Sequence, residues 1–297
     1  TMEFTFPIWC DSPLAAACRD EWAVGVFYKL RAVRRDTRFG PQLEIRRIRE
    51  VVEQDRQDGF DPLMCLPQSR YPPEELYREL LELARKELAN EGLRTFVTTI
   101  LEEFREALLT LPAARTHHHA YVGGWLEHTL SVARTCVFLA DKYRQLYPDL
   151  RPPLDRDLVI AGGILHDIGK LRELRFSTIT TEYSEEGALL GHLLLGRDIV
   201  REFASRVPLC PETQLRLEHL IIAHQRLPEW GSPKPPMTPE ALIVHYADDL
   251  DAKFHIYYQI LFTDSRDESL TSDRNILRQR LFRHLPPSSQ SSSPPSR

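Results

Sequence analysis

The sequence is poor in cysteine, and its cysteines form no motif. Five of the 297 residues are cysteine, and none is paired in a Cys-x-x-Cys motif. They stand at Cys10, Cys18, Cys65, Cys136 and Cys210. An odd number of scattered thiols argues against a disulfide-stapled extracellular domain and against a cysteine-ligated zinc site. We therefore expect reduced thiols and a cytoplasmic location.

Long hydrophobic runs are also missing. The longest are far shorter than the roughly 18 residues that suggest a membrane span. The first residues, TMEFTFPIWCDSP, lack a basic segment followed by an apolar one, so no secretory signal is visible. We expect no membrane partner. The hydrophobic fraction of 42% and the charged fraction of 27% are ordinary for a soluble protein.

An overall excess of positive charge is missing too. The formal net charge is −5, which taken alone argues weakly against a nucleic-acid binder. The segment 29–49 differs, because it holds eight Lys or Arg against two acidic residues, a net charge of +6. It is either a solvated strand pair or an electrostatic footprint for RNA phosphates. The second interpretation assigns phosphate contacts to Arg34, Arg35, Arg46 and Arg47.

The order of patterns predicts a mainly α protein in which a small β module precedes a helical bundle. Apolar and polar residues alternate over 23–49 around a turn, as in paired strands. We expect a β module at 1–57, a Pro- and Gly-rich linker at 58–73, a helical domain at 74–265, and an extension at 266–297 with a disordered tail. Helices are expected from residue 73 onward and at about 94–110, 122–146, 155–173, 185–206, 212–226 and 239–262, the last with Thr238 as its N-cap.

Several ionisable residues lie within apolar stretches that are predicted to be helical. In AGGILHDIGK, residues 161–170, His166 and Asp167 follow a small apolar run and Lys170 comes one turn later. Burying such groups costs several kcal/mol unless each has a partner, and a metal cation would be one. Similar interruptions occur at His128, His192, His219, His224, Asp248 and Asp251.

Helical periodicity sorts these candidates. Lys170 shares a face with His166. His219 and His224 lie five residues apart, so they do not easily serve one site. One face of the last expected helix carries His245, Asp248 and Asp251, whereas Asp249 points elsewhere and is interpreted as solvated.

Imidazole and carboxylate donors without thiolate suit Mn²⁺, Fe, Co, Ni and also Zn²⁺. The many oxygen donors differ from a closed structural zinc site and favour an open hydrolytic site. We expect Mn²⁺, in one or two ions, and leave Fe, Co, Ni and Zn open.

The adjacent His-Asp pair resembles the H…HD…D signature of the HD-domain metal phosphohydrolases. The surrounding stretches, which include HHAYVGGWLEHTLSVA, EYSEEGALLGHLLLG and EALIVHYADDLDAK, resemble bacterial 3′→5′ exoribonucleases of the YhaM type. These join an N-terminal OB-fold module to an HD domain, and the resemblance runs from about residue 20 to 262. The text before residue 50 matches the middle and closing strands of an OB-fold, so we expect that module to be truncated or degenerate.

The resemblance implies a set of site residues. One metal ion would be held by His128, His166, Asp167 and Asp248, and a second by His192 and His224 with Asp167 bridging. Gln225 stands where some HD proteins have the second histidine of a pair, which leaves the second ion open.

The implied reaction is hydrolysis of single-stranded RNA to 5′-mononucleotides, with Asp167 and Lys170 as catalytic residues. Weaker substrate contacts are expected at His118, His119, Trp230 and Ser232. His117 precedes His118 and His119 in a run of three histidines. The structural alternatives are a core role for Trp230 and a solvated loop for the three histidines. DNA as substrate and an oligomeric state stay open. The competing functions are a phosphohydrolase of nucleotides or other small phosphoesters, and a catalytically weak RNA-binding regulatory protein.

Overall fold

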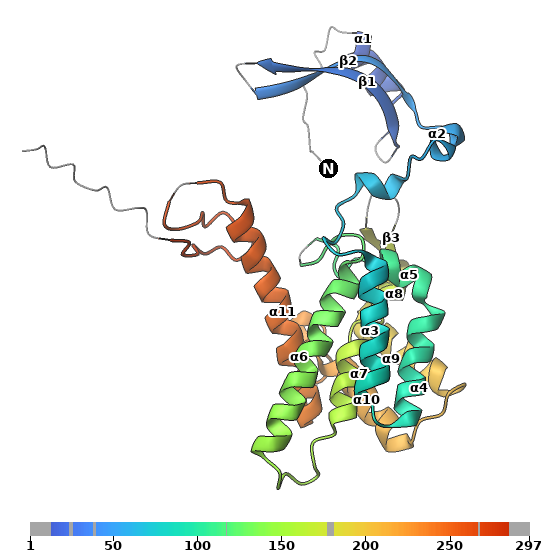
Figure 1. Cartoon of the computed structure of the whole chain (residues 1–297), viewed down its shortest axis with the longest axis vertical. Coiled ribbons are helices and arrows are strands. Elements are labelled where there is room, and N and C mark those ends of the chain that lie inside the picture. Colours follow the sequence, from blue (N-terminus) through green and yellow to red (C-terminus); the bar gives the residue numbers. More distant parts are fainter. Residues whose placement is uncertain are drawn as a thin grey trace, which may run out of the picture.

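The protein is mainly α-helical in the computed structural model, as the sequence predicts (Figure 1). The structure describes residues 13–23, 26–37, 40–116, 118–176, 181–266 and 268–284. The predicted disordered tail, residues 285–297, lies outside the described residues. Within the described part, no helix is both long and apolar enough to cross a membrane.

The N-terminal part contains one antiparallel hairpin. Strand β1 (Tyr28–Thr37) pairs with β2 (Gly40–Glu50), with a register shift between Arg31 and Ala32. Short helices flank it, α1 (Pro13–Asp20) and α2 (Glu53–Gln57), and neither was expected. An OB-fold has five strands, so the two strands described here do not show one. The linker contains a single 3₁₀ turn at Pro62–Cys65.

The helical domain follows from residue 73. Its helices are α3 (Pro73–Glu87), α4 (Glu91–Glu103), α5 (Arg105–Thr110), α6 (Gly124–Leu146), α7 (Arg156–Leu165), α8 (Lys170–Glu173), α9 (Glu185–Ala204), α10 (Pro211–Ala223) and α11 (Pro239–Thr263). A small pair of strands, β3 (Leu174–Phe176) and β4 (Thr181–Tyr183), connects α8 to α9. After α11, an isolated bridge joins Leu270 to Phe282.

Helix α7 lies at the centre of the domain. It packs against α6, α10, α11, α3 and α4, and every residue from Leu158 to Leu165 is buried. A helix that is apolar on all sides belongs in a core, which explains why residues 161–165, AGGIL, are small and apolar. Helix α11 begins where expected, since the Thr238 side chain accepts a hydrogen bond from the Ala241 main-chain N–H.

Two expected helices are broken. The predicted helix 94–110 divides at Phe104 into α4 and α5. The predicted helix 155–173 divides into α7 and α8, and the intervening turn contains His166 and Asp167. The turn passes so close to α9 that a Cβ on Gly169 would lie 1.9 Å from the His192 carbonyl oxygen. This approach sets the position of His166 and Asp167 at the end of a helix.

Candidate metal centre

Side chains from distant parts of the chain meet beside the buried end of α7. They are His128 on α6, His166 and Asp167 in the turn after α7, His192 on α9, His224 at the end of α10, and Asp248 on α11. His128 Nε2 lies 3.1 Å from Asp248 Oδ1 and 3.2 Å from His166 Nε2. His192 Nε2 and His224 Nε2 lie 3.4 and 3.6 Å from Asp167 Oδ1. The structure thus brings together all six residues for which the sequence predicts metal binding.

The other ring nitrogen of each histidine has its own partner. His166 Nδ1 lies 2.9 Å from the Gly163 carbonyl oxygen, and His224 Nδ1 lies 2.8 Å from the Ile221 carbonyl oxygen. His128 Nδ1 lies 2.7 Å from Asp251 Oδ2. Contacts of this kind fix the tautomer with Nδ1 protonated, so that the Nε2 lone pair faces the centre.

His192 is oriented by a kink. Gly191 has φ +72° inside α9, a conformation that favours glycine. Beyond the kink, the His192 main-chain N–H and its ring Nδ1 both lie 2.9 Å from Glu173 Oε1. Glu173 therefore fixes both the backbone and the ring of His192.

Two buried atoms of the centre, Asp167 Oδ1 and His224 Nε2, make no hydrogen bond to any described residue, although they lie 3.6 Å from each other. Leaving such groups buried and unsatisfied is costly, and both atoms face the other donors of the cluster. A divalent cation would satisfy them, and the imidazole and carboxylate donors fit Mn²⁺, Fe, Co, Ni or Zn²⁺.

Electrostatics keep two of the donors, His166 and Asp167, in forms that can bind a cation. Burial opposes the charged form of His128, but its hydrogen bonds to Asp248 and Asp251 outweigh this and raise the pKa of that imidazole to about 9. Burial lowers the pKa of the His166 imidazole to about 4, so this ring is neutral at physiological pH. Burial opposes the charge of Asp167, but Lys170 and His166 outweigh it and hold the pKa of this carboxyl well below its usual range. Lys170 Nζ lies 2.5 Å from Asp167 Oδ2, which confirms the predicted proximity of these two residues.

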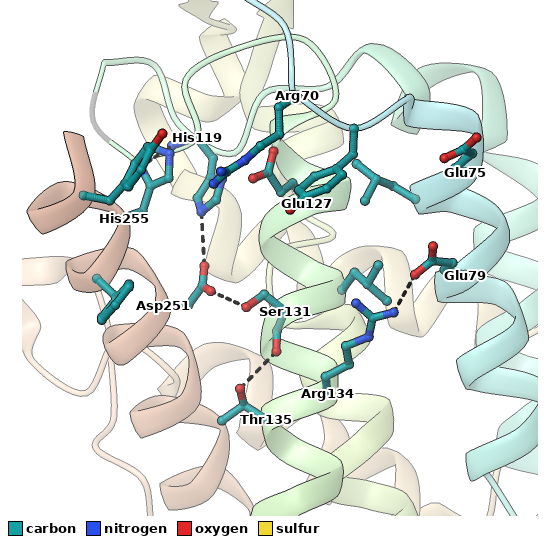
Figure 2. A pocket seen from close by; sticks show the side chains of 15 residues that line it. Arg70, Glu75, Glu79, His119, Glu127, Ser131, Arg134, Thr135, Asp251 and His255 are labelled. Carbon is teal, nitrogen blue, oxygen red and sulfur yellow. Dashed lines mark hydrogen bonds and ion pairs between the residues drawn. The ribbon is translucent and has the colours of Figure 1, made fainter. Parts of the chain in front are cut away.

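Asp251 and Glu173 are the polar partners that the sequence did not identify as part of this arrangement. Asp251 Oδ2 lies 3.2 Å from His119 Nε2, and Asp251 Oδ1 accepts a hydrogen bond from Ser131 (Figure 2). Asp251 Oδ2 also lies beside His128. The sequence signals for Asp251 were its place in an apolar helical stretch and its spacing of three residues from Asp248. Glu173 had no signal, because its contact with His192 depends on the kink at Gly191.

Beside the centre lies a cavity of about 350 Å³, called here the access cavity. Its lining includes Arg115, His118, Lys170, Tyr183, His192 and Trp230. Trp230 is half exposed rather than part of the core. The His118 ring lies 5.3 Å from the His128 ring between centroids. His118 and Trp230 therefore both line the cavity next to the histidine cluster.

The remaining predicted residues lie elsewhere. His119 is buried and faces Asp251 and Tyr121. Ser232 is buried and does not line the access cavity. His117 lies outside the described residues. His219 accepts a hydrogen bond from Met237 N, away from the centre.

His245 and Asp249, both on α11, have different surroundings. His245 Nδ1 lies 2.7 Å from the His224 carbonyl oxygen, so this histidine supports the backbone of a candidate ligand. Asp249 pairs with Lys253 at 2.7 Å and is partly exposed, away from the cluster.

The basic hairpin is partly neutralised by its own acids. Glu44 pairs with both Arg35 and Arg46, and Arg34 pairs with Asp36. Asp55, at the start of α2, pairs with Lys29 and Arg49. By contrast, Arg31 and Arg47 face each other in the strand register, and neither has an ion pair with a described residue. Among the described residues of the hairpin, the positive charge is therefore least compensated at this cross-strand pair.

Comparison with known proteins identifies a matching domain family and similar nucleases. The HD domain family model matches residues 125–253, and a model described as a putative helicase matches residues 73–175. The chain is 36% identical over 215 residues to the 3′-5′ exoribonuclease YhaM of Bacillus subtilis, covering 72% of this chain and 64% of that protein. It is 33% identical over 220 residues to the YhaM of Listeria monocytogenes, covering 74% and 66%. The chain thus spans just under two thirds of the length of these relatives. No solved structure matches.

Proposed function

We propose that the chain, which is similar to the YhaM exoribonucleases and matches the HD domain model over residues 125–253, is a metal-dependent 3′→5′ exoribonuclease that releases 5′-mononucleotides from single-stranded RNA. The observation that carries the proposal is that two groups of possible ligands, His128–His166–Asp248 and His166–Asp167–His224, share His166, and that Asp167 Oδ1 and His224 Nε2 make no hydrogen bond to a described residue. A purely structural cluster would satisfy these atoms internally.

We assign the ligands as follows. One Mn²⁺ ion would be held by His128, His166, Asp167 and Asp248. A second would be held by His192 and His224, with Asp167 between the two ions. Gln225 Nε2 lies 3.1 Å from His192 Nε2 and competes for that nitrogen, which makes the second position the weaker one.

A bound divalent cation supplies Lewis-acid activation of water and of a phosphoryl oxygen. The protein supplies position and charge. Asp167 and Asp248 provide the negative charge that holds a cation. Lys170 borders the access cavity while contacting Asp167, so its ammonium can also neutralise a phosphate oxygen of the substrate. Trp230, half exposed at the same cavity, offers a face on which a base can stack.

The test is incubation of the protein with Mn²⁺ and single-stranded RNA labelled at its 5′ end. A ladder of products shortened from the 3′ end is expected. Asp167→Ala should lose bound metal and hydrolysis while keeping its helical circular dichroism, because the core around α7 is apolar. Asp249→Ala, which removes a carboxylate paired with Lys253 away from the cluster, should behave like the wild type.

Full activity and normal metal content in Asp167→Ala would contradict the assignment of the centre. Turnover of mononucleotides without shortening of RNA would indicate a small-phosphoester hydrolase. Binding of RNA without any turnover would indicate a regulatory RNA-binding protein.

A further inference from the structure

Arg115 is an exposed cation at the access cavity. In the part of the chain that the structure describes, its side chain has neither an acidic partner nor a hydrogen bond; its guanidinium carbon lies 5.7 Å from the centroid of the Tyr183 ring. A comparable exposed arginine, Arg206, instead holds Glu103 through two nitrogens at 2.9 and 3.0 Å. The ring contact places the Arg115 guanidinium beside Tyr183 and leaves its N–H donors without a hydrogen bond to any described residue.

The other charged groups of the access cavity each have a partner within the protein. Glu173 accepts from both nitrogens of His192 that face it. Lys170 contacts Asp167 on the side of the histidine cluster. The positive charge of Arg115 is therefore uncompensated within the cavity, which favours an anionic ligand. The planar fork of a guanidinium matches a phosphate through two parallel hydrogen bonds.

The size and remaining walls of the cavity narrow the ligand further. A volume of about 350 Å³ is near the lower end for a small-molecule site. Two aromatic side chains from separate segments, Tyr183 on β4 and Trp230 after α10, border it. The aromatic faces suit a base, and the guanidinium of Arg115 suits a phosphate. His192 also lines the cavity, so the cavity as a whole matches one base, one sugar and one phosphate next to the metal centre.

We propose that the access cavity holds a single nucleotide unit and that Arg115, oriented by Tyr183, anchors its phosphate. This rests on the proposed function, since it identifies the occupant as the 3′-terminal nucleotide of the RNA. A nucleoside 5′-monophosphate then occupies the same cavity as the product. Arg115 acts in binding and lies outside the set of candidate metal ligands.

The experiment measures binding of adenosine 5′-monophosphate and of adenosine to the metal-loaded protein by calorimetry. Arg115→Gln should weaken binding of the monophosphate about 10-fold or more, the effect of losing hydrogen bonds to a charged group. It should leave the affinity for adenosine unchanged. Arg115→Lys keeps the charge but not the fork and should give an intermediate affinity. The matched control is Arg144→Gln, an equal change of charge on the exposed last turn of α6.

An unchanged affinity of Arg115→Gln for the monophosphate would overturn the anchor, as would an equal loss of affinity in Arg144→Gln. Failure of the proposed function looks different, because it is the absence of RNA shortening by the wild type. If RNA is not shortened but monophosphate binding still depends on Arg115, the anchor stands and the substrate is a small nucleotide.

Discussion

Asp251 offers a sharp test of how the centre is held, because it touches a candidate metal ligand without joining the cluster. Its Oδ2 lies 2.7 Å from His128 Nδ1. The same oxygen lies 3.2 Å from His119 Nε2, and Oδ1 accepts a hydrogen bond from Ser131 (Figure 2). His128 Nε2 is thereby directed at Asp248. We predict that Asp251→Asn weakens the binding of Mn²⁺ without unfolding the protein.

The magnitude follows from the contacts. Asparagine keeps the shape of aspartate but converts the charge-assisted contact with His128 into a neutral one. Hydrogen bonds to charged groups contribute about 1.5–3 kcal/mol, and about 1.4 kcal/mol corresponds to a factor of 10 in affinity. The expected loss is therefore about 10- to 100-fold, which agrees with the usual effect of changing a residue that orients a metal-binding histidine.

The assay is competition between the protein and a metal-binding dye for Mn²⁺, together with a thermal melt. The control is Asp249→Asn, two residues away on the same helix, whose carboxylate pairs with Lys253. It should retain the affinity of the wild type. Equal Mn²⁺ affinity in Asp251→Asn and the wild type would refute the idea that this carboxylate orients His128.

Two further predictions concern the hairpin and the second ion. Replacing Arg31 and Arg47 with Ser should make the slope of log RNA affinity against log salt shallower by about 1.4, since each neutralised phosphate of a single strand contributes roughly −0.7. Replacing the paired residues Arg35 and Arg46 with Ser should change the slope less. An unchanged slope after both double substitutions would show that the hairpin does not bind RNA. Gln225→His should raise the metal content towards two ions per chain, because a second imidazole would replace the amide beside His192 Nε2; elemental analysis that finds no extra metal would argue against a second site there.

The sequence predicted the candidate metal ligands better than the residues that orient them. His166 and Asp167 stood out because polar groups next to the apolar text of α7 must have partners. No pattern of this kind marks Glu173, since its role depends on the position of His192 after folding. Asp251 shared a helical face with Asp248, but spacing alone does not distinguish a ligand from the group that orients one.

The breaks in the helices escaped prediction for a related reason. The apolar periodicity of 155–173 continues through the turn, so a single helix was expected there. What interrupts it is tertiary contact, because Gly169 lies directly against the His192 carbonyl oxygen of α9. Local propensity carries no information about such a contact. The hairpin was predicted from its alternation, whereas the ion pairs that neutralise much of it depend on the pairing register.

The helix ends explain why two of the candidate ligands are placed where they are. His166 and His224 are the C-cap residues of α7 and α10, and each ring nitrogen Nδ1 meets the carbonyl oxygen three residues earlier. The last carbonyls of a helix lack partners within the helix, so the helix end itself supplies the acceptor that directs Nε2 outward. The same ends carry the negative pole of the helix dipole, which favours a nearby cation. A histidine moved into the interior of either helix would lose the free acceptor and the favourable field together, so the termination of α7 before His166 is itself part of the metal-binding arrangement.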